Sequence, residues 1–142
     1  TQVRTLAQEE AGQDAPAQPG RLQNWPVQLQ LVPVRAPYFD GCDLLIAADC
    51  TAYACGSFHA DFIRGHVTLI GCPKLDRADY EEKLTAILVE DNVRSITLTR
   101  MEVPCCGGLE YAARQAVEAS GKSIPMRVVT FMADGKLLPQ DA

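Results

Sequence analysis

Hydrophobic residues along this chain follow two periodicities. Short runs that are continuously apolar, or that alternate apolar and polar residues, are typical of β-strands. Such runs are found at 27–33, 43–48, 66–70, 94–99 and 126–131. Between them, apolar residues recur every three or four positions, which predicts amphipathic helices. The helices are expected at 52–64, 79–90 and 107–120.

From residue 43 onward, the predicted strands and helices alternate along the chain. This order is typical of a parallel sheet covered by helices on both faces. The run at 43–48 is continuously apolar, as expected for a strand buried on both sides. We therefore expect an α/β fold: a three-layer sandwich with a mostly parallel, doubly wound sheet of flavodoxin-like or Rossmann-like type and about five strands. The strand at 27–33 joins the next one without a helix, so its direction stays open.

Single residues mark the ends of several elements. Asp76 or Asp79 is suited to cap the helix at 79–90, and Gly121 is suited to end the helix at 107–120. Trp25 stands at the start of the first predicted strand, where we expect it to fill the core rather than to bind a ligand.

The first 24 residues differ in composition from the rest. Residues 1–24 are rich in Gln and Ala and contain few large apolar side chains, which predicts a flexible linker or arm. The remainder, 25–142, has the length of one ordinary domain.

Charge and hydropathy exclude two classes of partner. The net charge of −5, with no basic stripe, argues against nucleic acid. No run of 18 or more apolar residues is present, so no membrane span is expected. The six cysteines indicate either disulfides in an oxidising compartment or thiolate ligands in a reducing one. The α/β pattern favours the cytoplasm, and therefore metal or redox chemistry.

Four of the cysteines follow predicted strands. Cys50 follows the second strand, Cys72 the third, and the adjacent Cys105 and Cys106 the fourth. Loops that follow parallel strands leave from the carboxyl edge of the sheet, where open α/β sheets bind ligands. Neighbouring strands are about 4.8 Å apart, so we expect the four sulfurs to face one small volume. Cys42 precedes its strand and is expected at the opposite edge, as a bystander.

The remaining polar candidates carry weaker signals. Cys55 is expected to be a buried thiol, although it lies near enough to Cys50 to replace a ligand. His59 and His66 are expected to be structural or surface residues. Three charged residues share the carboxyl edge and are suited to tune a redox potential or to relay protons, although solvated loop charges are commoner: Asp49, Lys74 and Glu102.

Four thiolates can hold a [4Fe–4S] cluster, a [2Fe–2S] cluster or a structural zinc ion. Zinc sites usually contain paired Cys-x2–4-Cys motifs, and the four candidate ligands form no such pair, so the dispersed cysteines favour [4Fe–4S]. Gly107 and Gly108 let backbone amides approach sulfur, and the helix that follows Cys106 directs its positive end there. Two alternatives stay open: separate core cysteines, and a thiol-based redox enzyme or sensor that uses Cys105 and Cys106.

Six segments carry a resemblance to a known family, among them the Pro-Cys-Cys-Gly-Gly motif at 104–108. They lie at 25–29, 36–39, 43–50, 58–62, 70–76 and 101–109. Together they resemble the carboxyl-terminal region of ferredoxin-like, iron–sulfur cluster-binding proteins of anaerobic bacteria and archaea, and the likeness covers roughly 25–131.

The resemblance implies that Cys50, Cys72, Cys105 and Cys106 bind the cluster, for electron transfer or cluster-based redox chemistry. It also implies a ferredoxin domain or protein as the electron partner, either upstream in the same chain or separate. The Cys-x2-Cys motifs that usually precede this region in the family are not in this sequence. Whether the protein is an oxidoreductase component, and what its oligomeric state is, stay open.

Overall fold

The computed structural model describes residues 3–6, 17–76 and 79–139. Within these residues, a single sheet has the strand order β2–β1–β3–β4, and all neighbouring strands run parallel. The strands are β1 (Asp43–Ala48), β2 (Val67–Gly71), β3 (Ser95–Met101) and β4 (Met126–Phe131). The sheet therefore has four strands where the sequence predicts about five.

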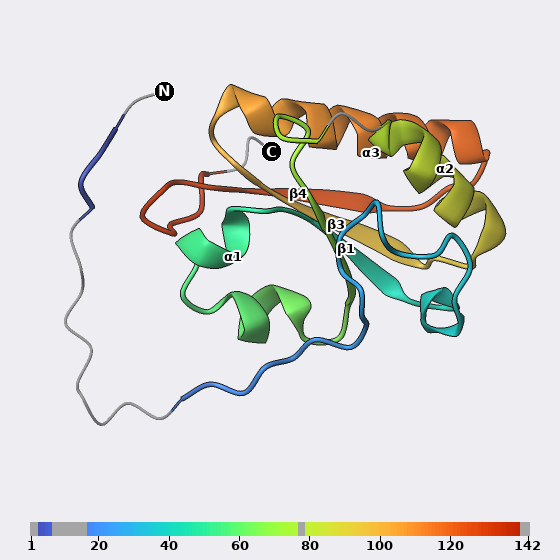
Figure 1. Ribbon diagram of the computed structural model, residues 1–142, viewed down its shortest axis with the longest axis horizontal. Helices are drawn as coiled ribbons and strands as arrows, with labels where there is room; N and C mark the ends of the chain where they lie inside the picture. Colours follow the sequence, from blue (N-terminus) through green and yellow to red (C-terminus); the bar gives the residue numbers. More distant parts are fainter. Residues whose placement is uncertain (1–2, 7–16, 77–78, 140–142) are drawn as a thin grey trace.

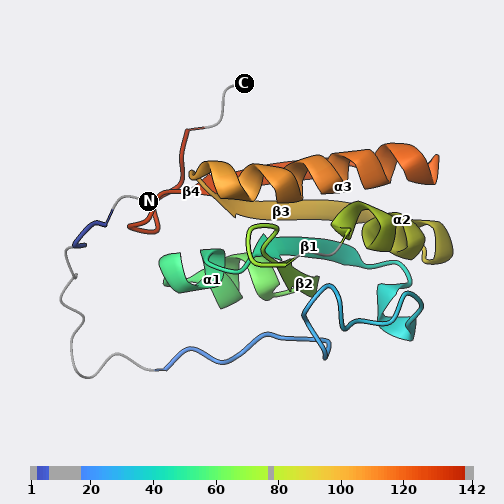
Figure 2. The same cartoon turned by 45° about the horizontal axis from the view of Figure 1, so that its top comes forward.

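Helices cover both faces of this sheet (Figures 1 and 2). The helices α2 (Tyr80–Glu90) and α3 (Gly107–Ser120) pack against each other on one face. The short helix α1 (Thr51–Ala54) and the π-helical turn η2 (His59–Ile63) lie on the other. The connections change face at β1, which lies in the middle of the sheet. This arrangement confirms the expected three-layer, doubly wound α/β fold.

The core explains why these segments form strands. Leu44, Leu45 and Ile46 are consecutive in β1 and at most 1% exposed, because helices cover both faces of this strand. Burial of each such side chain contributes roughly 1.5–3 kcal/mol. On the face of α1, the ring of Phe62 lies 5.2 Å from Phe58 and 5.3 Å from Phe131, which joins η2 to the last strand.

The helix ends agree with the sequence prediction. Asp79 caps α2, and its side chain accepts a hydrogen bond from the Glu82 amide at 3.2 Å. Gly121 ends α3 in the left-handed region at φ 72°. At the other end of α2, the Lys122 ammonium donates to the carbonyl oxygens of Leu88 and Asp91, which would otherwise be unpaired.

The predicted strand at 27–33 is wrong except for one bridge, between Gln28 and Ile70. The chain instead turns here, because the amides of Leu31 and Val32 both donate to the Gln28 carbonyl. Leu29 and Val32 are each 1% exposed, whereas Leu31 is 70% exposed. The segment contains apolar residues at both strand and helical-turn spacing, and the turn is the arrangement that buries Leu29 and Val32.

Two further predictions need correction. Trp25 is 77% exposed and does not fill the core. The single helix predicted at 52–64 is divided into α1 and η2. Gly135 packs on the end of α1 so closely that a Cβ there would lie 2.3 Å from the Ala54 carbonyl oxygen. The chain turns at 55–57 and begins a second helical segment there.

The predicted arm, 1–24, lies partly outside the described residues. Its last residue, Asn24, is buried against the edge strand β2. The Asn24 side chain accepts from the Thr68 amide at 2.8 Å and donates to the Thr68 carbonyl at 2.9 Å. Farther along, Ile70 exchanges backbone hydrogen bonds with Val27 and Leu29. The segment from Asn24 to Leu29 therefore covers the edge of β2.

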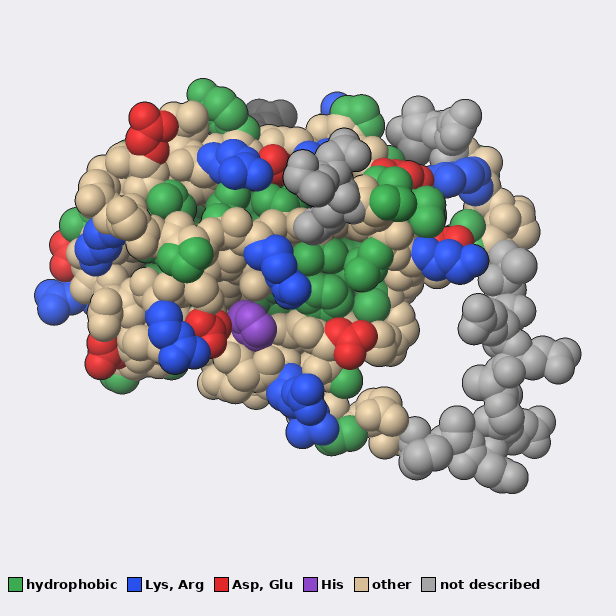
Figure 3. Space-filling view, turned by 180° about the vertical axis from the view of Figure 1, so that it is seen from behind, with side chains coloured by type: hydrophobic (Ala, Val, Ile, Leu, Met, Phe, Trp, Pro, Cys, Tyr) green, Lys and Arg blue, Asp and Glu red, His purple; other side chains and the backbone are tan. Residues whose placement is uncertain are grey.

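Seen from behind the view of Figure 1, the molecule has hydrophobic side chains near the middle of its surface, with scattered acidic and basic groups around them (Figure 3). None of the helices in the described part of the chain combines the length and hydrophobicity that a bilayer crossing requires.

Candidate functional site

The four cysteines predicted as ligands all lie beyond the carboxyl ends of strands. Cys50 follows β1, Cys72 follows β2, and Cys105 and Cys106 follow β3. Since β1 and β3 are neighbours whose connections leave toward opposite faces, the crevice between their ends is the switch point where open α/β sheets bind ligands. Cys42 precedes β1 at the other edge, as predicted.

Cys50 is exposed at the start of α1. The next residue, Thr51, fixes the turn: its hydroxyl donates to the Ala48 carbonyl at 2.8 Å and lies 3.0 Å from the Thr99 hydroxyl. The pKa of the Cys50 thiol is raised, first by burial and then by the negative charge of Cys72, Asp49 and Cys105. Cysteines from three strand ends thus lie close enough to influence one another electrostatically.

The Cys72 loop is held by α2. The Cys72 amide donates to the Tyr80 hydroxyl at 2.9 Å, and this hydroxyl donates to the Asp76 carboxylate. Burial and the hydrogen bond to Asp76 raise the pKa of Tyr80, so the hydroxyl keeps its proton. Gly71 is required here, because a Cβ would lie 2.8 Å from the Tyr80 oxygen.

Cys105 and Cys106 lie on a short 3-10 turn, η3 (Pro104–Cys106), that leads directly into α3. Cys105 is exposed, whereas Cys106 is 6% exposed and occupies the N-cap position of α3. The pKa of Cys106 is raised, chiefly by burial, while a backbone hydrogen bond at Met101 and the charge of Arg100 act in the opposite direction.

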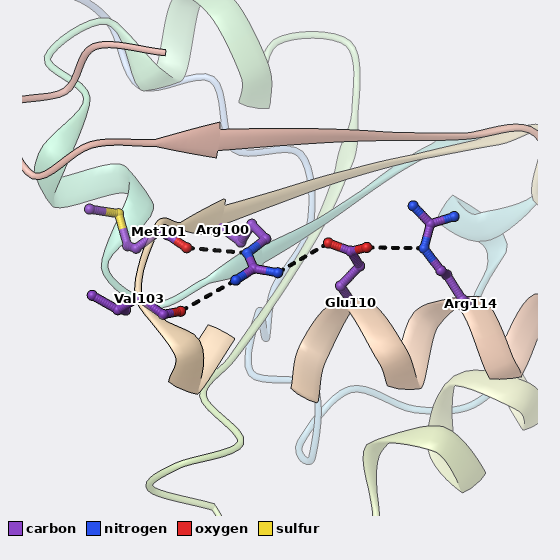
Figure 4. A network of polar contacts seen from close by, with 5 residues as sticks. All are labelled: Arg100, Met101, Val103, Glu110 and Arg114. Atoms are coloured by element: carbon purple, nitrogen blue, oxygen red, sulfur yellow. Dashed lines mark hydrogen bonds and ion pairs between the residues drawn. The ribbon is translucent and has the colours of Figure 1, made fainter. Parts of the chain in front are cut away.

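Arg100 braces this loop against α3 (Figure 4). Its guanidinium donates to the carbonyl oxygens of Met101 and Val103, at 3.2 and 3.3 Å, and to the Glu110 carboxylate at 3.2 Å. The second Glu110 oxygen accepts from Arg114 at 3.1 Å. The hydrogen bonds to both arginines lower the pKa of Glu110 despite the opposing effect of its burial, which is the largest single influence. One side chain thus joins the end of β3, the cysteine loop and the first turn of α3.

The first turn of α3 also contacts the Cys72 loop. A Cβ at Gly108 would lie 3.3 Å from Cβ of Pro73, the residue after Cys72. This close approach brings the loop that follows β2 alongside the loop that follows β3. Since β1 lies between these strands, Cys50 completes a group drawn from three adjacent loops.

The other candidates lie apart from this group or form ordinary contacts. Cys55 is 7% exposed, and its sulfur lies 3.7 Å from the Ser57 hydroxyl. His59 accepts from the Arg21 amide at 3.0 Å, and His66 lies 3.0 Å from the Arg64 carbonyl oxygen. Lys74 and Glu102 are exposed at the carboxyl edge. Asp49 differs, because its buried Oδ1 atom has no hydrogen-bond partner among the described residues.

Sequence reasoning missed Tyr80 and Arg100, the two side chains that hold the cysteine loops. Arg100 stands near the end of an otherwise buried strand, and a charged residue in such a run is a usable signal. Tyr80 has no comparable signal, because a tyrosine at the start of a helix is common.

Single-ion binding requires donor atoms that nearly touch. In the described part of the chain, no three or more His, Cys, Asp or Glu side chains are arranged in this way. A cluster of several irons separates its thiolates more widely than one ion does. Cys50 and Cys105 are exposed, and they lie in the same loop group as the less accessible Cys72 and Cys106.

The fold and the position of this group define an open, doubly wound α/β protein with its candidate site at the switch point. Residues 36–142 match the family model of a Rossmann-like domain, and the chain belongs to this family. An uncharacterized protein of Archaeoglobus fulgidus is 31% identical over 119 residues, which span 83% of this chain and 84% of the relative. No solved structure matches the chain.

Proposed function

We propose that this protein binds one iron–sulfur cluster, [4Fe–4S], through Cys50, Cys72, Cys105 and Cys106, and serves in electron transfer or cluster-based redox chemistry. The observation that carries the proposal is the convergence of three cysteine loops at the switch point of the sheet. Two findings support it: the raised pKa of Cys50, to which the charges of Cys72 and Cys105 contribute after burial, and the close approach of Gly108 to Pro73. When bound, the cluster supplies the ability to accept and release single electrons.

The residues around the sulfurs fit this role. The amino end of α3 directs its partial positive charge toward Cys106, and the Arg100 guanidinium adds a full one nearby. Both offset the negative charge that four thiolates would bring. Tyr80 and Arg100 fix the loops, so that the ligands are held in place before the cluster binds.

The protonation of Cys50 and Cys106 argues against either of them as the reactive thiol of a redox enzyme, which leaves that alternative to Cys105. A reactive cysteine needs a lowered pKa, because the thiolate is the nucleophile. The pKa values of Cys50 and Cys106 are raised instead, so both are protonated at neutral pH. Metal binding displaces such protons, and we therefore expect cluster loading to release protons and to be favoured by rising pH. A structural zinc ion ranks below the cluster, because Cys50, Cys72, Cys105 and Cys106 form no Cys-x2–4-Cys pair of the kind typical of zinc sites.

The proposal extends to the cellular setting. All six cysteines, each within the described residues, are free thiols, which is consistent with a reducing cytoplasm. The electron partner would be a ferredoxin-type domain or protein, as the likeness of the sequence motifs to ferredoxin-associated proteins implies.

The test is anaerobic purification or reconstitution, followed by visible absorption and by iron and sulfide analysis. We expect a broad band that bleaches on reduction and about four irons per chain. Serine variants of Cys50, Cys72, Cys105 and Cys106 should each lose iron. Cys42→Ser is the matched control and should keep it.

Two outcomes would contradict the proposal. A colourless protein with one zinc ion would make the site structural. Iron lost from Cys42→Ser but kept by Cys72→Ser would show that the switch-point cysteines are not the ligands.

A further inference from the structure

The Arg100 side chain lies beside the turn that carries the two adjacent cysteines. Its Nη2 atom donates to the Val103 carbonyl at 3.3 Å, two residues before Cys105. Its Nη1 atom lies 3.9 Å from the position that a Cβ of Gly107 would take, directly after Cys106. The guanidinium therefore contacts the chain both before and after the cysteine pair, and only 19% of the side chain is exposed.

The positive charge of Arg100 is held in a fixed place. Each of its three nitrogens has its own acceptor, because Nε donates to the Met101 carbonyl at 3.2 Å, Nη2 to Val103 and Nη1 to the Glu110 carboxylate at 3.2 Å (Figure 4). A planar guanidinium that is bound in three directions cannot turn away into solvent. Since two of the three acceptors are uncharged carbonyl oxygens, most of the positive charge stays beside the turn.

Glu110 moderates this charge. Its burial opposes ionisation, but the hydrogen bonds from Arg114 and Arg100 outweigh that effect and lower its pKa, so the carboxylate is ionised at neutral pH. Arg114 binds the other carboxylate oxygen, and its side chain is 55% exposed (Figure 4). The cysteine turn therefore lies next to one guanidinium, with a carboxylate behind it and a second, more solvated guanidinium farther away.

We propose that Arg100 raises the reduction potential of the cluster held by the four candidate ligand cysteines, and that Glu110 limits this effect. The inference rests on the proposed function and adds the residues that regulate the site. Reduction adds one electron, taken from an external reductant, and it needs no bond or proton to be transferred. A nearby positive charge stabilises the more negative, reduced state more than the oxidised one. Low exposure of the guanidinium limits the screening of this effect by salt.

A purely structural role of Arg100 predicts a different pattern. If its hydrogen bonds only held the turn in place, Arg100→Gln and Glu110→Gln would both loosen the turn and would act in the same direction. If the charge is what matters, the two variants remove charges of opposite sign and should move the potential in opposite directions. Arg100→Lys separates the two roles further, because it keeps the charge but loses the planar group that reaches three acceptors.

The experiment is a redox titration of the full chain after anaerobic reconstitution, with dithionite as the reductant and visible absorption as the signal. Arg100→Gln should lower the equilibrium constant of reduction by about tenfold, which lowers the midpoint potential by about 59 mV. Glu110→Gln should raise the equilibrium constant by about threefold or more. Arg100→Lys should stay within about threefold of the unsubstituted protein. Arg114→Gln is the matched control and should also change it by less than about threefold, because its charge is more solvated and lies beyond Glu110.

Iron content, measured on every sample, separates this inference from the cluster proposal. An unsubstituted chain that binds no iron would overturn the cluster proposal and this inference with it. A loaded protein whose potential is unchanged by Arg100→Gln, or moves in the same direction in Arg100→Gln and Glu110→Gln, would overturn this inference alone. If Arg100→Gln does not retain iron, the other two variants decide: a higher potential in Glu110→Gln and a nearly unchanged one in Arg100→Lys support the inference, and any other pair of results overturns it.

Discussion

Gly71 lies where β2 meets the Cys72 loop, and it leaves no room for a side chain. A Cβ at this position would lie 2.8 Å from the hydroxyl oxygen of Tyr80 and 2.9 Å from its Cζ atom. We expect Gly71→Ala to displace the Tyr80 ring, because Gly71 is held in the sheet by its strand pairing with β1. The ring is 4% exposed, so its displacement also disturbs the core.

The magnitude follows from the contacts that are lost. The displaced hydroxyl would no longer pair with the Cys72 amide or with Asp76. A buried amide without a partner costs about 1–3 kcal/mol, and overpacking costs about 1–3 kcal/mol more. Because the two effects overlap, we expect Gly71→Ala to lower the free energy of unfolding by about 2–4 kcal/mol. Tyr80→Phe alone should lower it by about 1–3 kcal/mol.

Urea denaturation followed by circular dichroism measures these changes, provided that the m-value is preserved. Gly56→Ala is the matched control, because no atom lies within 4 Å of its Cβ position and its φ is not positive. It should change stability by less than about 1 kcal/mol. Gly71→Ala should cost less in the Tyr80→Phe background, where the hydrogen bonds are already gone. Equal costs in both backgrounds, or a cost no larger than that of Gly56→Ala, would refute the idea that the Tyr80 hydroxyl holds this loop.

Four further variants test other parts of the fold by equilibrium denaturation. Gly135→Ala should lower the free energy of unfolding by about 3 kcal/mol or more, because it combines a φ of 89° with a clash against the backbone of α1. Gly121→Ala, at φ 72° in open space, should lower it by about 1 kcal/mol. Equal losses in the two variants would contradict the clash. Lys122→Met removes the ammonium that donates to carbonyl oxygens at the end of α2, and it should lower the free energy of unfolding by about 1–2 kcal/mol. An unchanged unfolding midpoint would show that Lys122 does not cap α2. The hydrogen bond from Arg94 holds the pKa of Asp43 at about 2, below its unfolded value, so this carboxylate stabilises the fold above about pH 4 and the stabilisation is lost as the pH falls toward 2. Asp43→Asn should therefore cost about 1 kcal/mol at neutral pH and should flatten the stability profile between about pH 4 and 2; a profile that keeps its slope would show that Asp43 is not responsible.

The sheet was the part of the structure most accessible to sequence reasoning. Residues 44–48 of β1 are continuously apolar because both faces of this strand are covered, and such a run predicts a buried strand from the sequence alone. Helix α3 could also be predicted from the sequence, because its apolar stripe ends at Gly121, where the left-handed backbone favours glycine. Topology then follows, since alternation of strands and helices restricts the sheet to few arrangements.

The segment before β1 was less accessible, because its structure depends on distant contacts. The alternating pattern of 27–33 fits a strand, yet the chain turns there to bury Leu29 and Val32. Trp25 is exposed although most tryptophans are largely buried, and nothing in its neighbours along the chain indicates this.

The grouping of the cysteines could be predicted because it depends only on where strands end. The side chains that hold the cysteine loops in place could not be predicted. The position of Arg100 between the Met101 and Val103 carbonyls and Glu110 depends on the angle at which α3 leaves the sheet. Asp49 was noted for its charge, but the lack of a hydrogen-bond partner for its Oδ1 atom among the described residues is a property of the three-dimensional packing.

The Asn24 contact with β2 has a consequence for where the folding unit begins. The family match starts at residue 36, but a protein shortened to 36–142 would lose Asn24, Leu29 and Val32 together. The Thr68 and Ile70 backbone groups would then lie on a bare strand edge, the kind of surface that recruits a strand from another molecule. The family match and the packed part of the structure therefore begin at different places in this chain. A protein shortened to 36–142 would be expected to associate through β2, whereas in the longer chain the segment from Asn24 to Leu29 covers that edge.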